Sequence, residues 1–349
     1  MIKSKVAVLI PTLNNHKELE IVLKSLNEQT WKGDLEVAVV GPKNDPGEEV
    51  TKKYKATWID DQGSRNRADA CNIGIKELNC DILLFTDDDV IPPNDWVEKL
   101  VRWFEKDDVA GVGGQNWAPK TDSIFSKMVD VAFGAKYVTA GTRYGKVVKG
   151  ELIEIDHNPG CNSAYLKSVL DDVNGFEKGC IGAEDVVLDH KIRSKGNKLW
   201  FDPESIMPHR RRVPPALFKQ MRNYGYVRTL ANSRWPDLRS WSHLAIAIFP
   251  ILFFTAIIST IIGIFNQELD LLYKIPTVLG LIYISLCLVG STLGNSPHRN
   301  PITIFGSIFM IFSAHFFYGM GVIKGLWQIN FGGGAAAGLG IQLDDKIRN

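Results

Sequence analysis

The sequence predicts an α/β domain with a mostly parallel sheet, followed by three transmembrane helices. Two features of the residue pattern support this prediction. Across residues 1–212, short apolar runs alternate with amphipathic segments, as in a parallel sheet whose strands are joined by right-handed helical crossovers. Residues 241–325 are then nearly all apolar, and each of their three apolar stretches approaches or exceeds the roughly 20 residues that cross a bilayer.

The elements of the first 212 residues follow from apolar runs and from helical spacing. Strands are predicted at Val6–Ile10, Leu35–Val40, Ala56–Ile59, Ile82–Phe85, Val109–Gly113 and Lys198–Phe201. Helices are predicted at Glu18–Gln29, Glu48–Tyr54, Ala68–Leu78, Trp96–Phe104 and Leu166–Val173, and from about Glu184 to Gly196. Residues 117–150 allow no firm assignment, although Phe125, Met128, Val129 and Ala132 have helical spacing and residues 134–149 resemble a mobile loop.

The rest of the chain divides into an interface segment, a membrane region and a tail. Residues 213–240 hold a basic amphipathic segment that is expected to lie in the membrane interface, although an ordinary surface helix has the same pattern. The membrane region, residues 241–325, contains the expected spans at about 242–265, 275–294 and 301–323. His315 and Tyr318 are polar residues within the third span. They either form interhelical hydrogen bonds or have a direct functional role. The glycine-rich residues 326–349 are expected to be a flexible tail.

Charged residues and cysteines indicate where the chain lies in the cell. The connector after the first span holds Glu268 and Asp270, whereas the next connector holds His298 and Arg299. The positive-inside rule therefore predicts a multi-pass protein of the cell membrane with residues 1–240 in the cytoplasm. A formal net charge of +1 does not support nucleic-acid binding, and five cysteines without CxxC spacing favour a reducing compartment over a zinc site.

Three consecutive aspartates, Asp87, Asp88 and Asp89, follow the fourth predicted strand. Carboxylates this close raise one another's pKa unless a cation lies among them, and the carboxyl edge of an open α/β sheet is where ligands bind. Because strand side chains alternate, Asp87 and Asp89 can point to one side and bind Mg²⁺ or Mn²⁺ together with a diphosphate. The alternative is an acidic turn in which Asp88 or Asp89 caps the next helix.

Other polar residues are expected near the same edge. Thr12 and Asn14 follow the first strand, and Arg67 supplies a cation of the kind that binds diphosphates. A separate acidic pair, Glu184 and Asp185, suggests a general base, although acidic residues also complement the dipole at a helix N-terminus. Together with the membrane region, these residues imply group transfer from a nucleotide-diphosphate donor to a lipid-borne acceptor.

Five motifs occur in the order found in the family 2 glycosyltransferases. They are Pro11-Thr12-Leu13-Asn14, Gly63 with Arg67 to Gly74, Asp87-Asp88-Asp89 with its trailing prolines, Pro159-Gly160-Cys161-Asn162, and Glu184-Asp185. Tyr224-Gly225 followed by Arg228 also resembles an element of the membrane-bound, succinoglycan-type enzymes that elongate lipid-linked saccharides. The resemblance implies a GT-A (nucleotide-diphospho-sugar transferase) domain over residues 1–212.

The resemblance also implies roles for the metal and catalytic residues. Asp87 and Asp89 correspond to the metal-binding aspartates of the family, and His209 to a third metal ligand of some relatives. For His209, a place in a basic cluster at the membrane surface is the alternative. Asp185 corresponds to the catalytic base, with Glu184 beside it in the same motif.

On the donor side, the resemblance implies that Thr12, Asn14 and Arg67 contact the nucleotide and that Asp88 lies near the donor. The acidic residue that often reads the base in this family is replaced by Gly41-Pro42-Lys43, so Asp45 or Asp60 is the candidate substitute. The nucleotide of the donor, UDP or GDP, therefore stays open.

The implied activity is an inverting, metal-dependent transfer of a sugar to a hydroxyl of a lipid-linked, polyprenyl acceptor. Because the QxxRW motif of processive synthases is absent, a single addition is favoured over polymerisation. Two alternatives stay open. One is a polyprenyl-phosphate glycosyltransferase, in which the lipid phosphate attacks; the other is a membrane scaffold that binds nucleotide-sugar without catalysis.

Overall fold

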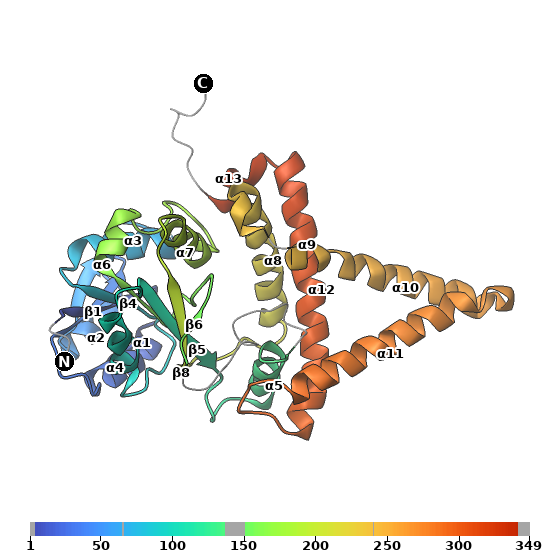
Figure 1. The fold of residues 1–349 in the computed structure, drawn as a ribbon, viewed down its shortest axis with the longest axis horizontal. Helices are drawn as coiled ribbons and strands as arrows, with labels where there is room; N and C mark the ends of the chain where they lie inside the picture. The colour runs from blue at the N-terminus through green and yellow to red at the C-terminus, as the bar shows by residue number, and fades with distance from the viewer. Residues whose placement is uncertain (1–3, 65, 137–150, 240, 341–349) are drawn as a thin grey trace. The chain divides into compact units, whose positions relative to one another are not determined.

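The computed structural model describes residues 4–64, 66–136, 151–239 and 241–340 (Figure 1). It contains two compact units. Unit 1 comprises Met1–Pro119, Val147–Arg210 and Leu339–Asn349, and unit 2 comprises Lys120–Lys146 and Arg211–Gly338. The boundary at Arg210 lies near the predicted domain end at residue 212, and the described residues 120–136 belong to unit 2.

Unit 1 is built on a sheet with the strand order β3-β2-β1-β4-β7-β5-β8-β6. The strands are β1 (Val6–Pro11), β2 (Leu35–Gly41), β3 (Thr57–Asp60), β4 (Ile82–Phe85), β5 (Gly111–Trp117), β6 (Ile153–Glu154), β7 (Ser163–Leu166) and β8 (Leu199–Pro208). Strands β1 to β4 pair in parallel, as do β5 and β8, whereas β7 is antiparallel to both β4 and β5. The sheet is therefore mostly parallel, as predicted, although β6 and β7 were not anticipated.

The helices of unit 1 connect these strands and cover the sheet (Figure 1). They are α1 (His16–Asn27), α2 (Gly47–Lys53), α3 (Arg67–Glu77), α4 (Trp96–Val101) with the 3-10 turn η1 (Arg102–Glu105), α6 (Lys167–Asp172) and α7 (Glu184–Ser194). The apolar spacing of α1 buries Leu19 and Val22 against Val8 and Leu84 of the sheet. Each fully buried side chain of this kind contributes about 1.5–3 kcal/mol, which fixes the sheet that carries the site.

Strand register brings two polar turns together at one edge of the sheet. Leu9 of β1 pairs with Phe85 of β4 in parallel, so the turns that follow the two strands lie side by side. His209, directly after β8, forms an isolated antiparallel bridge with Val90. The Asp87–Asp89 turn is thereby enclosed by segments from the beginning and the end of the unit.

Unit 2 is helical. Its elements are α5 (Ile124–Phe133), α8 (Ala216–Arg234), η3 (Pro236–Leu238), α9 (Trp241–Ala245), α10 (Ile248–Phe265), η4 (Gln267–Leu269), α11 (Leu271–Thr292), α12 (Pro301–Phe331) and α13 (Gly334–Leu339). Three of its stretches are long and apolar enough to cross a membrane: Trp241–Phe265, Leu271–Thr292 and Pro301–Phe331. Candidate membrane helices are therefore present at the three predicted positions, and the second begins four residues earlier than expected.

Two other predictions about unit 2 require correction. The third span continues to Phe331, and Gly334–Leu339 is helical, so the expected flexible tail is wrong for these residues. Residues 341–349 of that tail lie outside the described residues, as do residues 137–150 of the expected loop. The helical spacing noticed from residue 125 corresponds to α5.

Glycines allow α8 and α12 to approach closely. A Cβ atom on Gly225 of α8 would lie 2.1 Å from the Tyr318 carbonyl oxygen, and one on Gly321 of α12 would lie 2.0 Å from the Arg222 carbonyl oxygen. Leu217 of α8 is also buried in a cluster with Met310 of α12. Within unit 2, α8 is therefore packed against a neighbouring helix and is not an isolated amphipathic segment.

Two polar side chains inside unit 2, Asp130 and His315, form hydrogen bonds between separate segments. The buried Asp130 carboxylate accepts from Arg211 Nε at 2.9 Å and from Ser296 Oγ at 2.8 Å, which ties α5 to the segment before α8 and to the loop before α12. His315 Nδ1 lies 2.9 Å from the Tyr283 hydroxyl, which matches the interhelical hydrogen bonding considered for this residue.

Candidate active site

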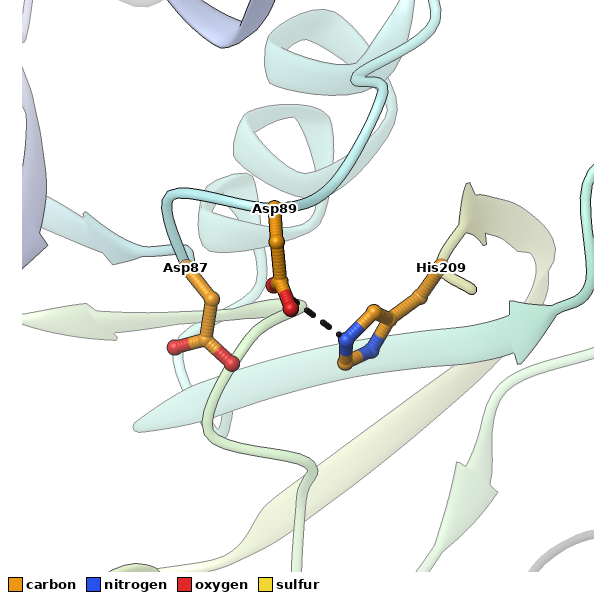
Figure 2. Close-up of side chains that lie close together, drawn as sticks. All are labelled: Asp87, Asp89 and His209. Carbon is orange, nitrogen blue, oxygen red and sulfur yellow. Dashed lines mark ion pairs between the residues drawn. The ribbon is translucent and has the colours of Figure 1, made fainter. Parts of the chain in front are cut away.

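Asp87, Asp89 and His209 form a cluster at the carboxyl edge of the sheet. Each offers one ligand atom, and these atoms lie within 4.8 Å of one another (Figure 2). His209 Nε2 lies 3.3 Å from Asp89 Oδ1. Two carboxylate oxygens and an imidazole nitrogen suit a divalent cation such as Mn²⁺ or Mg²⁺, so the residues present fit the predicted ion.

The electrostatic environment of His209 is dominated by the cluster. Burial alone would lower the pKa of His209, but the neighbouring Cys161 sulfur and the Asp89 carboxylate raise the pKa of His209 well above its ordinary value. Without a cation the imidazole is thus protonated and pairs with Asp89. A bound divalent cation would replace that proton.

Asp88 points to a different set of partners. Its carboxylate accepts from Thr12 Oγ1 at 2.5 Å and from Asn15 Nδ2 at 2.9 Å, so it ties the turn after β4 to the turn after β1. Burial raises the pKa of the Asp88 carboxyl, and these two hydrogen bonds offset part of that effect. Donor contacts by Asp88 and by the buried Thr12 remain predictions.

Two other predicted donor residues, Asn14 and Asp60, have exposed side chains. The backbone N–H of Asn14 donates to Asp45 Oδ2 at 2.7 Å, and Asn14 has a φ of 53° in the left-handed region. Asp60 ends β3 and accepts from the Gln62 N–H at 2.9 Å. Asn14 follows β1 and Asp60 is the last residue of β3, so both lie at the carboxyl edge of parallel strands, where ligands bind in open α/β sheets.

Arg67, the first residue of α3, connects the cluster to the acidic pair. Its Nε donates to Asp87 Oδ1 at 3.2 Å, its Nη2 donates to the Gly160 carbonyl at 2.8 Å, and its Nη1 lies 3.8 Å from Glu184 Oε1. Although burial opposes the charge, Asp87 and Glu184 raise the pKa of Arg67. A permanent cation therefore lies between two groups of carboxylates that are far apart in the sequence.

Glu184 and Asp185 begin α7, directly after Ala183, whose φ of 56° is unusual for a residue with a side chain. Burial and the Asp185 charge raise the pKa of Glu184. Asp185 Oδ1 accepts from the Val186 N–H at 2.8 Å, which is compatible with the helix-terminus role considered above. Its other oxygen lies 3.6 Å from His157 Nε2.

The sequence analysis missed the residues behind Asp185. His157 Nδ1 lies 2.9 Å from Asp189 Oδ2, and the Tyr165 hydroxyl donates to Asp189 Oδ1 at 2.8 Å. One signal for Asp189 was available, since it follows Asp185 by four residues and so shares its helix face. Nothing in the sequence indicated His157 or Tyr165, because the fold brings them there from a loop and from β7.

Comparison with known proteins shows which family this chain is similar to. Residues 7–173 match the family described as Glycosyl transferase family 2. The O-antigen chain rhamnosyltransferase RfbN of Salmonella typhimurium is 24% identical over 216 residues, which cover 60% of this chain and 68% of the relative. The succinoglycan biosynthesis protein ExoA of Rhizobium meliloti is 24% identical over 258 residues, covering 69% of this chain and 74% of the relative.

A solved structure supports the fold. The mannosyltransferase PcManGT of Pyrobaculum calidifontis, determined in complex with GDP-Man and Mn²⁺, has a TM-score of 0.55 and 17% sequence identity, covering 94% of this chain and 88% of that one. At this identity the likeness concerns the fold alone. Together with the family match, it confirms the predicted GT-A architecture followed by candidate membrane helices.

Proposed function

We propose that this protein, whose residues 7–173 form a glycosyl transferase family 2 domain, transfers a sugar from a nucleotide-diphosphate donor to a hydroxyl of a lipid-linked acceptor. The observation that carries the proposal is the placement of Arg67 between Asp87 and Glu184. A cation-binding cluster and a separate acidic pair thereby share one surface, as a donor site and a general base must. A scaffold that only binds nucleotide-sugar would not need the second group.

On the donor side, Asp87, Asp89 and His209 would hold Mg²⁺ or Mn²⁺. When bound, the cation neutralises charge that develops on the departing nucleotide diphosphate. Arg67 adds a positive charge beside it, and Thr12, Asn14, Asp60 and Asp88 form the remaining donor-facing set. The complex of PcManGT with GDP-Man and Mn²⁺ supports this cofactor assignment, and the donor of this chain is a UDP- or GDP-sugar.

On the acceptor side, Asp185 is the proposed general base. Its carboxylate takes the proton of the acceptor hydroxyl, the hydroxyl oxygen attacks the anomeric carbon, and the bond from that carbon to the diphosphate oxygen breaks with its electron pair leaving on the nucleotide. Attack from the face opposite the leaving group inverts the anomeric centre. Glu184 is less suited because Arg67 lies beside it and its side chain is only 16% exposed, against 28% for Asp185.

The acceptor is proposed to be a polyprenyl-linked saccharide. Three helices long and apolar enough to cross a membrane support a multi-pass location in the cell membrane, and residues 1–240 would face the cytoplasm. The names of RfbN and ExoA connect similar chains to O-antigen and succinoglycan assembly. A catalytic site held at the membrane surface would not have to find such an acceptor by diffusion in three dimensions, because both would be confined to the same surface.

The test compares Asp185→Asn with Glu184→Gln in membranes that contain the full chain. Release of UDP or GDP from a panel of nucleotide-sugars, with Mg²⁺ or Mn²⁺, identifies the donor. Asp185→Asn is expected to lower transfer by about 10²- to 10⁴-fold while binding of the nucleotide with Mn²⁺ persists. Glu184→Gln should lose less. If Asp185→Asn keeps most of the transfer, a phosphate nucleophile needing little base catalysis replaces the hydroxyl, and the polyprenyl-phosphate alternative gains support.

A further inference from the structure

A carboxylate, an imidazole and a second carboxylate lie in a row that begins at the proposed base. Asp185 Oδ2 lies 3.6 Å from His157 Nε2, and His157 Nδ1 lies 2.9 Å from Asp189 Oδ2. All three residues belong to unit 1, so one folded body sets their geometry. The row leads from the surface into the protein, because the side chains of Asp185 and His157 are 28% and 26% exposed and that of Asp189 is 0% exposed.

The hydrogen bonds to Asp189 determine which ring nitrogen of His157 carries the proton when the imidazole is neutral. Asp189 accepts from the Asn158 N–H at 2.7 Å and from the Tyr165 hydroxyl at 2.8 Å. An ionised carboxylate is an acceptor only, so its third partner, His157 Nδ1, must be the donor. A neutral imidazole that carries its proton on Nδ1 presents a lone pair on Nε2, which is the atom that faces Asp185.

Asp189 is also suited to stabilise a positive imidazole. Burial raises the pKa of the Asp189 carboxyl, and the hydrogen bonds from His157, Asn158 and Tyr165 act in the opposite direction. A fully buried anion held by neutral donors gains from a neighbouring cation, and His157 is the group beside it that can become one.

We propose that His157 receives from Asp185 the proton of the acceptor hydroxyl, while Asp189 holds the resulting imidazolium. The proton moves from the acceptor oxygen to Asp185 and then to His157 Nε2, and it finally leaves to water, so Asp185 is again a carboxylate for the next turnover. This assignment rests on the proposed function, in which Asp185 is the base. His157 thus acts only through Asp185, as the acceptor of its proton, and it touches neither donor nor acceptor.

The experiment uses the full chain in membranes and the donor that the wild type turns over. His157→Ala is expected to lower kcat by roughly 10- to 100-fold and to leave the KM of the donor nearly unchanged, because the donor site lies on the other side of Arg67. Added imidazole is expected to restore part of kcat. His190→Ala, on the same helix as Asp185, is the matched control. Its kcat should stay close to that of the wild type and should not increase when imidazole is added.

Two outcomes would overturn the relay. One is a wild-type kcat in His157→Ala, and the other is a lowered kcat that imidazole does not restore. If His157→Ala does not fold, kcat is measured for His157→Gln instead. A wild-type kcat in that variant likewise contradicts the proposal. Asp185→Asn separates this proposal from the proposed function: if that variant still transfers, the base assignment itself is wrong, whereas an inactive Asp185→Asn with a fully active His157 variant refutes the relay alone.

Discussion

Removing the Asp130 carboxylate should destabilise unit 2 more than any surface change. In the structure, Asp130 is paired with Arg211 at 2.9 Å, and their side chains are 1% and 11% exposed. Asp130→Ala would remove the carboxylate to which the Arg211 guanidinium and the Ser296 hydroxyl both donate. Breaking a buried ion pair from one side costs about 3–5 kcal/mol. For a unit of this size the expected fall in the unfolding midpoint is roughly 6–20 °C.

The assay is thermal unfolding of the purified chain in detergent, compared with two further variants. Asp270→Ala removes an ion pair with Lys274. The side chains of Asp270 and Lys274 are 41% and 52% exposed, so this variant should leave the unfolding midpoint almost unchanged. The double variant Asp130→Leu with Arg211→Met removes both buried charges and should recover most of the loss. An Asp130→Ala midpoint close to that of the wild type would refute the reasoning, as would a double variant no more stable than the single one.

Three further predictions concern the site and helix packing. Chelation by EDTA should abolish transfer, and added Mn²⁺ should restore it. Asp89→Ala should raise the Mn²⁺ concentration needed for half-maximal rate by about tenfold or more. Transfer that is undiminished in EDTA would exclude the metal role. Arg67→Lys should lower kcat/KM on the order of 10²-fold, because one ammonium cannot reproduce the guanidinium's three contacts, and a wild-type value would contradict this. Gly321→Ala should cost about 1–3 kcal/mol in unfolding experiments because its Cβ would meet the Arg222 carbonyl, whereas Gly280→Ala, with open space around it, should not destabilise.

The fold was predictable where sequence pattern and local structure agree. Apolar runs identified β1 and β4, and hydropathy identified the three spans. Strand β7 was missed because its four residues run antiparallel between β4 and β5, so the partners that make it a strand are distant in the sequence. The end of α12 was grouped with the glycine-rich stretch that follows it, and the helix α13 was missed because the glycines in and around it favour flexibility.

The candidate site was predictable to the extent that its residues are adjacent in the chain or fit a motif. Asp87 and Asp89 came from their spacing, and His209 came from resemblance alone. The partners of Arg67 and the row behind Asp185 depend on how α3, α7 and the loop before β7 pack, which no local pattern encodes. Asp88 shows the same limit, because its hydrogen bond to Thr12 joins turns 76 residues apart.

The left-handed conformation of Ala183 has a consequence for engineering. A residue with a side chain in this conformation costs roughly 1–2 kcal/mol, so packing around the start of α7 must enforce it. Ala183→Gly would relieve that strain, but it would also free the backbone two residues before Asp185. We therefore expect Ala183 to be a point where stability and activity trade against each other, so that a more stable variant is a slower enzyme.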